Sequence, residues 1–260
     1  MTVEAGLYAL NLGGNAFDAA IAVAGELTPL VAALEEYVRR REELDKRLTA
    51  GFDAEQTRLL SGTSVGVHNP LFSPDGEWVV YFSAPDQQIK KIAVSGGAAV
   101  TLVDATIPFG MSWEAMGTVG QFGPSSIFFG QPAGVMQVSA NGGTAELVVD
   151  ARDGEQIHGP QLLPGGEWVL FSSTTVGGVS RWDEGNVVAE SVETGERRLL
   201  ITGGSDARYL PTGHLLYVLE NVLFAIAFDL GRMEVTGGPV SVVEGVERAV
   251  FIAEEHLSAA

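Results

Sequence analysis

The sequence contains no cysteine, and this absence excludes disulfide bonds, thiolate nucleophiles and cysteine-based zinc sites. Basic residues are also few: 15 Lys and Arg stand against 33 Asp and Glu, which gives a formal net charge of −18. Such a charge disfavours binding to nucleic acid or to an anionic membrane surface. We therefore expect no nucleic-acid partner, and solubility is the simplest role of the acidity.

A long uninterrupted apolar run is missing as well. The most apolar stretch, residues 19–34, is interrupted by Glu26 and Pro29. It is also shorter than the roughly 20 apolar residues that a membrane helix needs. Residues 1–14 lack the basic start and the apolar core of a secretory signal. We expect membrane contact only through a missing or degenerate helix, and these features leave the localisation open.

Histidine is scarce, with four residues in the chain, and none forms an H-E-x-x-H or H-x-H arrangement. We therefore expect neither a metal site nor a cofactor. Residues 62–66 fit the G-x-S-x-G pattern of serine hydrolases, but the helix that this pattern requires does not follow. We interpret the segment as a loop, and we predict no catalytic residues and no enzymatic activity.

Glycine and apolar residues, by contrast, are abundant: 33 glycines and 46% hydrophobic residues are typical of a folded chain rich in turns. A Pro-Asp-Gly turn at residues 74–76 precedes strand-forming residues at 78–82, and a related turn and strand recur at 164–171. A second, hairpin-type turn follows within each unit. The glycines that open a strand in successive units are Gly76, Gly117, Gly166 and Gly213.

The spacing of these turns, about 40 to 50 residues, is typical of four-stranded β-propeller blades. We predict a mainly β fold: a partial β-propeller of about four four-stranded blades, with an α-helical N-terminal extension. The extension is assigned to residues 1–55, which are rich in helix formers. The alternative is that 37–40 and 57–60 are outer strands of a partial blade. The propeller segment is 56–260, with blades at about 69–103, 111–149, 158–201 and 206–243.

The repeat units resemble the WD-repeat-like, TolB-type β-propellers of bacteria. This resemblance begins with F-S-P-D-G-E-W at residues 72–78 and becomes more specific at 204–215, 223–230 and 235–240. There the sequence looks like the extracytoplasmic propeller that follows the membrane helix of bacterial serine/threonine protein kinases. The resemblance implies a non-catalytic binding or scaffold module, a sensor or interaction domain outside the cytoplasm, with a protein or a small molecule as its ligand.

The sequence departs from those kinases in two respects. It contains about four units where such propellers have more, and it has no glycine-rich loop, His-Arg-Asp or Asp-Phe-Gly motif. We therefore expect a fragment, a truncated reading frame or a degenerate relative. Residues 13–24 also resemble the first helix of gamma-glutamyltransferases. The alternative function is thus a propeller-associated hydrolase or a transferase remnant.

Five side chains form the candidate binding set: Trp182, His68, His158, Asp206 and Arg208. Trp182 lies in a polar loop, where an aromatic ring is expected to be exposed. The two histidines each precede the first strand of a blade, and equivalent positions would place both near one end of the central channel. Asp206 and Arg208 are expected to point the same way on a strand. The alternatives are hydrogen-bonded loop histidines and a salt bridge or carbonyl clamp between blades.

Overall fold

The computed structural model describes residues 66–114, 125–178 and 181–246, and these residues form four separate four-stranded antiparallel sheets. Within each sheet the strands follow one another in chain order, so each sheet is a meander of successive hairpins. Blade 1 contains β1 (Val67–Phe72), β2 (Trp78–Ser83), β3 (Gln88–Ala93) and β4 (Val100–Asp104). Blade 2 contains β5 (Met111–Glu114), β6 (Ser126–Gln131), β7 (Gly134–Ser139) and β8 (Glu146–Asp150). Blade 3 contains β9 (Gln156–Leu162), β10 (Trp168–Thr174), β11 (Asn186–Ser191) and β12 (Arg197–Thr202), and blade 4 contains β13 (Ser205–Leu210), β14 (His214–Leu219), β15 (Val222–Asp229) and β16 (Glu234–Glu244).

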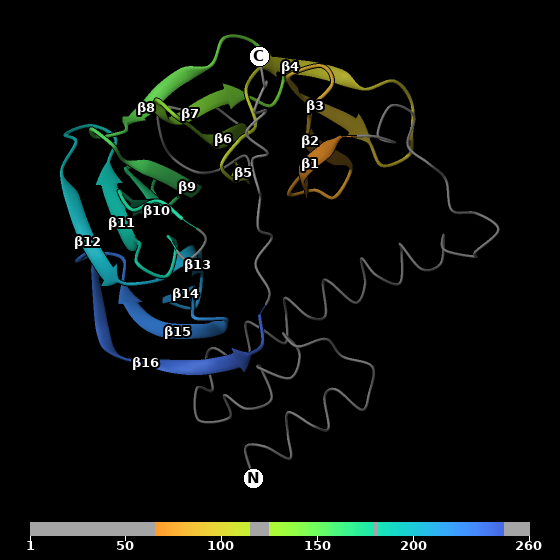
Figure 1. Ribbon diagram of the computed structural model, residues 1–260. Helices are drawn as coiled ribbons and strands as arrows, with labels where there is room; N and C mark the ends of the chain where they lie inside the picture. The colour runs from red at the N-terminus through yellow and green to blue at the C-terminus, as the bar shows by residue number, and fades with distance from the viewer. Residues whose placement is uncertain (1–65, 115–124, 179–180, 247–260) are drawn as a thin grey trace, which may run out of the picture.

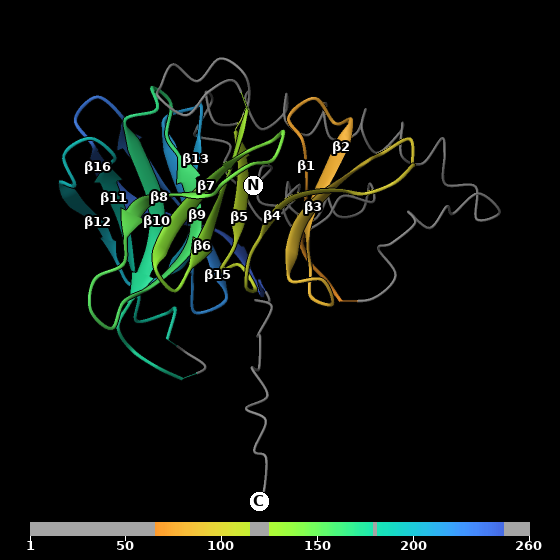
Figure 2. The ribbon, with the colours of Figure 1, turned by 90° about the horizontal axis from the view of Figure 1, so that it is seen from above.

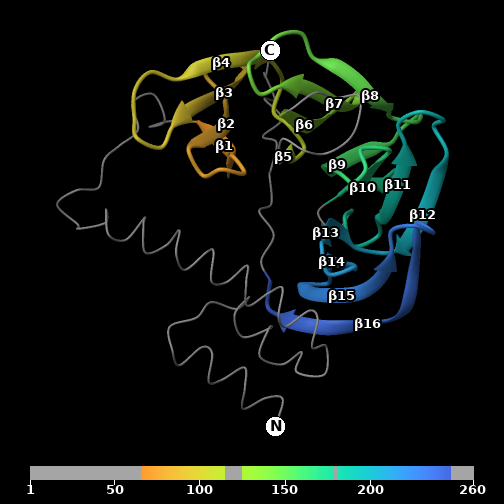
Figure 3. The same ribbon diagram turned by 180° about the vertical axis from the view of Figure 1, so that it is seen from behind.

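The four blades lie side by side around a common centre (Figure 1). The first strand of each blade is innermost and the fourth is outermost. Seen from above, the strands of neighbouring blades run alongside one another (Figure 2). The described strands form an arc that is open between blade 1 and blade 4, as the view from behind also shows (Figure 3).

A separate hydrophobic core fills the space between each pair of neighbouring blades. Phe129 belongs to the core between blades 1 and 2, whereas the adjacent Phe128 belongs to the core between blades 2 and 3. On β10, Phe171 faces blade 2 and Leu170 faces blade 4. Successive side chains on a strand point to opposite faces, so a sheet with two covered faces requires a continuous apolar run. This requirement explains why the second strands read as unbroken apolar segments.

The turn at residues 74–76 forms as predicted. The amide of Gly76 donates to the carbonyl of Ser73, and the amide of Ser73 donates to the carbonyl of Trp78, both at 2.8 Å. Gly76 has a φ of 73°, a conformation that glycine adopts without steric cost. In blade 3 the equivalent Gly166 has the same φ of 73°. Gly213 in blade 4 has a φ of 78°, whereas Gly117, predicted for blade 2, lies outside the described residues. The turn is thus a repeat of local structure in blades 1, 3 and 4.

The predicted fold class is confirmed for the part of the chain that the structure describes: it is mainly β, with four four-stranded sheets. The predicted helical extension at 1–55, the alternative strands at 37–40 and 57–60, and Ser64 of the G-x-S-x-G pattern all lie outside the described residues. Within the described ranges, no helix has the length and apolar character needed to cross a membrane.

Candidate functional site

The innermost strands of blades 1, 3 and 4 share an irregularity near their start. Their pairing with the second strand shifts register there, and each shift contains a residue with positive φ: Asn69 (51°), Gly159 (61°) and Asp206 (57°). Gly110 (81°) takes the corresponding place just before β5 in blade 2. Glycine fits this backbone conformation best. At Asp206 the chain therefore keeps a carboxylate where glycine would fit more easily.

These irregular positions connect the blades along the centre of the arc. Nδ2 of Asn69 donates to the carbonyl of Pro108 at 2.9 Å, and the amide of Gly159 donates to the carbonyl of Phe109 at 2.8 Å. Gly110 and Gly159 pack so closely that a β-carbon on Gly110 would lie 2.8 Å from the Cα of Gly159. We call this line of positive-φ residues and their hydrogen-bonded neighbours the inner rim.

Four of the five predicted binding residues come together at the inner rim between blades 3 and 4. His158 lies on β9, Trp182 lies in the connection from β10 to β11, and Asp206 and Arg208 lie on β13. Nδ1 of His158 is 3.2 Å from Oδ1 of Asp206, so the pair becomes an ion pair when the imidazole is protonated. The ring centroids of His158 and Trp182 are 5.0 Å apart. We call these four residues the rim site.

Arg208 forms the carbonyl clamp that was one of the sequence-based alternatives. Its Nη1 donates to the carbonyl of Gly159 at 2.7 Å and to the carbonyl of Ala207 at 2.9 Å, which connects β13 to the irregular turn of β9. Burial lowers the pKa of the Arg208 guanidinium, and the charges of Asp206 and Glu114 oppose this effect only in part. Among the described residues, no carboxylate lies within ion-pair distance of Arg208.

Glu114, at the end of β5, is a further charged group near the rim site that sequence reasoning missed. Burial raises the pKa of Glu114, and a hydrogen bond from the amide of Leu162 and the charge of Arg208 act in the opposite direction. Its signal in the sequence is slight: a single acidic residue closes the short segment Met-Ser-Trp-Glu. Only the packing of β5 against β9 brings it towards blades 3 and 4.

His68 is not part of the rim site. It lies on β1 in blade 1, with its ring centroid 6.2 Å from that of Phe82. It occupies the same place in its strand as His158 does, because each precedes a residue with positive φ. Blade 2 lies between the two histidines, so their equivalence in the repeat does not bring them together (Figure 1).

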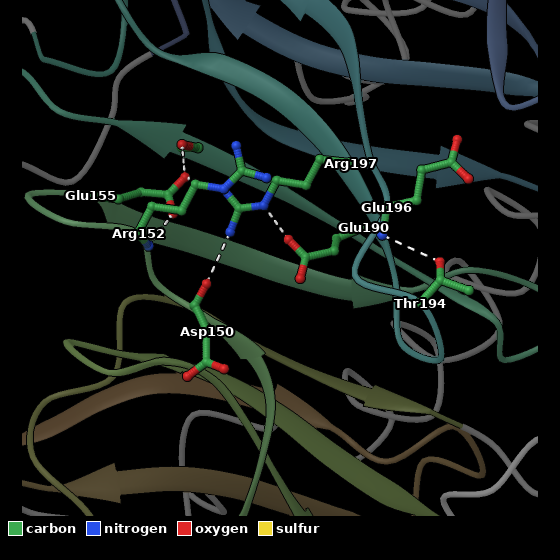
Figure 4. Close-up of polar contacts among 8 residues, drawn as sticks. Asp150, Arg152, Glu155, Glu190, Thr194, Glu196 and Arg197 are labelled. Carbon is green, nitrogen blue, oxygen red and sulfur yellow. Dashed lines mark hydrogen bonds and ion pairs between the residues drawn. The ribbon is translucent and has the colours of Figure 1, made fainter.

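A second cluster of charges lies at the junction of blades 2 and 3 (Figure 4). Nη1 of Arg197 is 2.6 Å from Oε1 of Glu155, and Nη2 donates to the carbonyl of Asp150 at 2.9 Å. Nε of Arg197 pairs with Glu190, and the hydroxyl of Ser173 donates to Glu155. The side chains of Arg197 and Glu155 are only 10% and 5% exposed. The charged groups of this cluster are bound to one another and to the backbone, so we assign the cluster a structural role.

The polar groups of the rim site suit recognition of a ligand. Among the described residues, no hydroxyl is hydrogen bonded to Nδ1 of His158. In the same ranges, no three His, Asp or Glu side chains are arranged to hold a metal ion. The site instead combines an aromatic ring, an imidazole–carboxylate pair and a guanidinium, which are groups that orient a polar ligand.

No protein-family model matches the sequence, and no curated protein is similar to it. Solved structures share its fold, however. A chain of the nidogen/laminin complex has a TM-score of 0.50 at 12% identity, with 70% of this chain and 65% of that chain covered. An auxiliary nutrient binding protein from Bacteroides thetaiotaomicron has a TM-score of 0.50 at 14% identity, with 71% and 44% covered. A TolB protein from Agrobacterium tumefaciens has a TM-score of 0.47 at 14% identity, with 68% and 66% covered.

These similarities show the fold and nothing finer. The chain spans less than two thirds of the length of each of these solved chains. A luciferin-regenerating enzyme is also similar, with a TM-score of 0.51 at 8% identity, so the fold alone does not separate binding from catalysis. The predicted β-propeller architecture is confirmed, whereas the relation to kinase propellers and to gamma-glutamyltransferases stays a prediction.

Proposed function

We propose that this chain is a non-catalytic β-propeller binding module that holds a small molecule at the rim site. The observation that carries this proposal is the convergence of His158, Trp182, Asp206 and Arg208 from two blades and a connecting loop. The carboxylate of Asp206 adds to it, because it lies 3.2 Å from Nδ1 of His158 on the neighbouring blade.

The similar structures support a binding role as a class of function. One is named as a nutrient binding protein and another is part of a complex between two proteins. The finer part of the proposal, a sensor domain related to bacterial serine/threonine kinases, rests on the sequence resemblance at residues 204–215, 223–230 and 235–240. A kinase reading frame with a membrane helix directly upstream of this gene would support it, and an unrelated genomic neighbourhood would count against it.

Saturation-transfer NMR with a mixture of sugars, amino acids and small organic acids tests the binding proposal. We expect a subset of these compounds to receive saturation from the parent protein, and Trp182→Ala and His158→Ala to abolish the transfer. Phe72→Ala is the matched control, because Phe72 is 45% exposed at the end of β1 and far from the rim site. Binding that survives both rim substitutions would place the ligand elsewhere, and the absence of any bound compound would argue against the module as proposed.

A further inference from the structure

Arg197 and Arg208 are both withdrawn from solvent, but their charges are balanced in different ways. Arg197 meets two carboxylates and a backbone carbonyl, and its side chain is 10% exposed. Arg208 is half-buried and meets backbone carbonyls only. A buried charge without an opposite partner is costly to the folded state. The structure thus maintains at Arg208 a cation that the described residues do not neutralise by direct contact.

The hydrogen-bonding capacity of Arg208 is only partly used. A guanidinium carries five N–H donors on three nitrogens, and both described acceptors, the carbonyls of Gly159 and Ala207, are bound by Nη1. Nε and Nη2 therefore have no acceptor among the described residues, and the side chain as a whole is half-buried. Together these two nitrogens form the planar fork that matches a carboxylate in bidentate fashion.

We propose that Nε and Nη2 of Arg208 bind the carboxylate of a small organic acid at the rim site. This inference rests on the proposed function, because it assigns a chemical class to the ligand of the same site. Trp182 is half-buried beside His158 and offers an apolar surface to the remainder of such a ligand.

Two acidic groups lie near Arg208, and neither is in ion-pair contact with its Nε or Nη2. Oδ1 of Asp206 lies 3.2 Å from Nδ1 of His158, and Oδ2 accepts a hydrogen bond from the hydroxyl of Ser205 at 2.8 Å. Glu114 is partly buried, and burial raises its pKa, so the carboxyl takes up a proton more readily than a solvated one does.

The test compares each carboxylate with its neutral amide by isothermal titration calorimetry at constant ionic strength. The probes are acetate, succinate and benzoate, with acetamide, succinamide and benzamide as their isosteric controls. We expect at least one carboxylate to bind about tenfold or more tightly than its amide, as charge-assisted bidentate hydrogen bonds imply. Arg208→Gln should remove this preference, because it deletes the guanidinium. Arg208→Lys keeps the positive charge but lacks the planar pair of donors. Its preference for a carboxylate over the amide should therefore lie between that of the parent and that of Arg208→Gln.

Arg232→Gln is the control variant, because it removes the same charge from a side chain that is 75% exposed on a turn of blade 4. It should bind the carboxylates as the parent does. The inference is overturned if no carboxylate binds better than its amide, or if Arg208→Gln retains the preference. The comparison in the parent needs no variant, so it holds even if Arg208→Gln fails to fold. Sugars that bind in a Trp182-dependent manner, with no carboxylate bound more tightly than its amide, would leave the binding module intact and refute only this inference.

Discussion

Removing the charge of Arg197 should destabilise the propeller strongly, because two buried carboxylates depend on it. In Arg197→Met, Glu155 and Glu190 lose their counterion while the rest of the fold keeps them away from water. The carbonyl of Asp150 also loses its donor, which weakens the connection from blade 2 to blade 3. Breaking a buried ion pair by deleting one partner costs about 3–5 kcal/mol. Urea denaturation at pH 7 should show a loss of this size in the free energy of unfolding.

The neighbouring Arg198 provides a matched control on the same strand. Its side chain is 37% exposed and pairs with Glu196, which is 54% exposed, and it also donates to the carbonyl of Arg232 and lies over the ring of Trp168, 5.2 Å from the ring centroid. Solvent-exposed pairs of this kind contribute about 0–1 kcal/mol. Arg198→Met should therefore cost less than about 1 kcal/mol by the same measurement. A similar loss in the free energy of unfolding for both variants would show that burial of the ion pair does not determine its contribution to stability.

The cost of Arg197→Met should also depend on pH. Burial alone would raise the pKa of Glu155, but hydrogen bonds from Arg197, the amide of Arg152 and Ser173 outweigh it and bring the pKa below its ordinary 4.5. A carboxyl whose pKa is lowered by folding stabilises the native state above its unfolded pKa, and this contribution disappears as pH falls through the folded pKa. The stability gap between parent and variant should thus be largest near pH 7 and narrow below pH 4.5. A small gap at pH 7, or a large one that is constant with pH, would refute this reasoning.

Two further substitutions test the inner rim by urea denaturation. Gly110→Ala should cost about 2 kcal/mol or more, because φ is 81° and the new β-carbon would lie 2.8 Å from the backbone of Gly159. Gly177→Ala is the control and should leave the stability nearly unchanged, because its β-carbon would meet no atom within 4 Å. An equal loss of stability in the two variants would contradict the close packing at Gly110. Asp206→Gly should change stability by less than about 1 kcal/mol, since glycine suits a φ of 57° and the half-exposed pair with His158 contributes little. A loss above about 2 kcal/mol would make the Asp206 carboxylate a structural group rather than a recognition group.

The blades could be predicted from the sequence because their main signals are local. A turn such as the one at Gly76 needs glycine at a fixed place, and the strand that follows needs a continuous apolar run, so both recur at the period of the blade. The Arg197 cluster has no such signal. Arg197, at the start of β12, and Glu155, directly before β9, are 42 residues apart, and only the tertiary fold brings them into contact.

The sequence predicted which residues form the rim site, but it did not predict that four of them lie together. His158, Trp182, Asp206 and Arg208 are conspicuous because of their residue types in a chain poor in histidine and basic residues. Their meeting depends on the register shift in β13 between Ser205 and Arg208, which alters the simple alternation expected for Asp206 and Arg208. A shift of this kind depends on the pairing with β14, so a pattern within β13 alone does not reveal it.

The same repeat position therefore serves two purposes in this arc. In blades 1, 2 and 3 it holds Asn69, Gly110 and Gly159, whose contacts join one blade to the next. In blade 4 it holds Asp206, whose carboxylate points to His158 of the preceding blade. Asp206 also joins blade 4 to blade 3, because its amide donates to the hydroxyl of Ser172 at 2.9 Å. What distinguishes blade 4 is that this position also brings a carboxylate to His158, from which the proposed site is built.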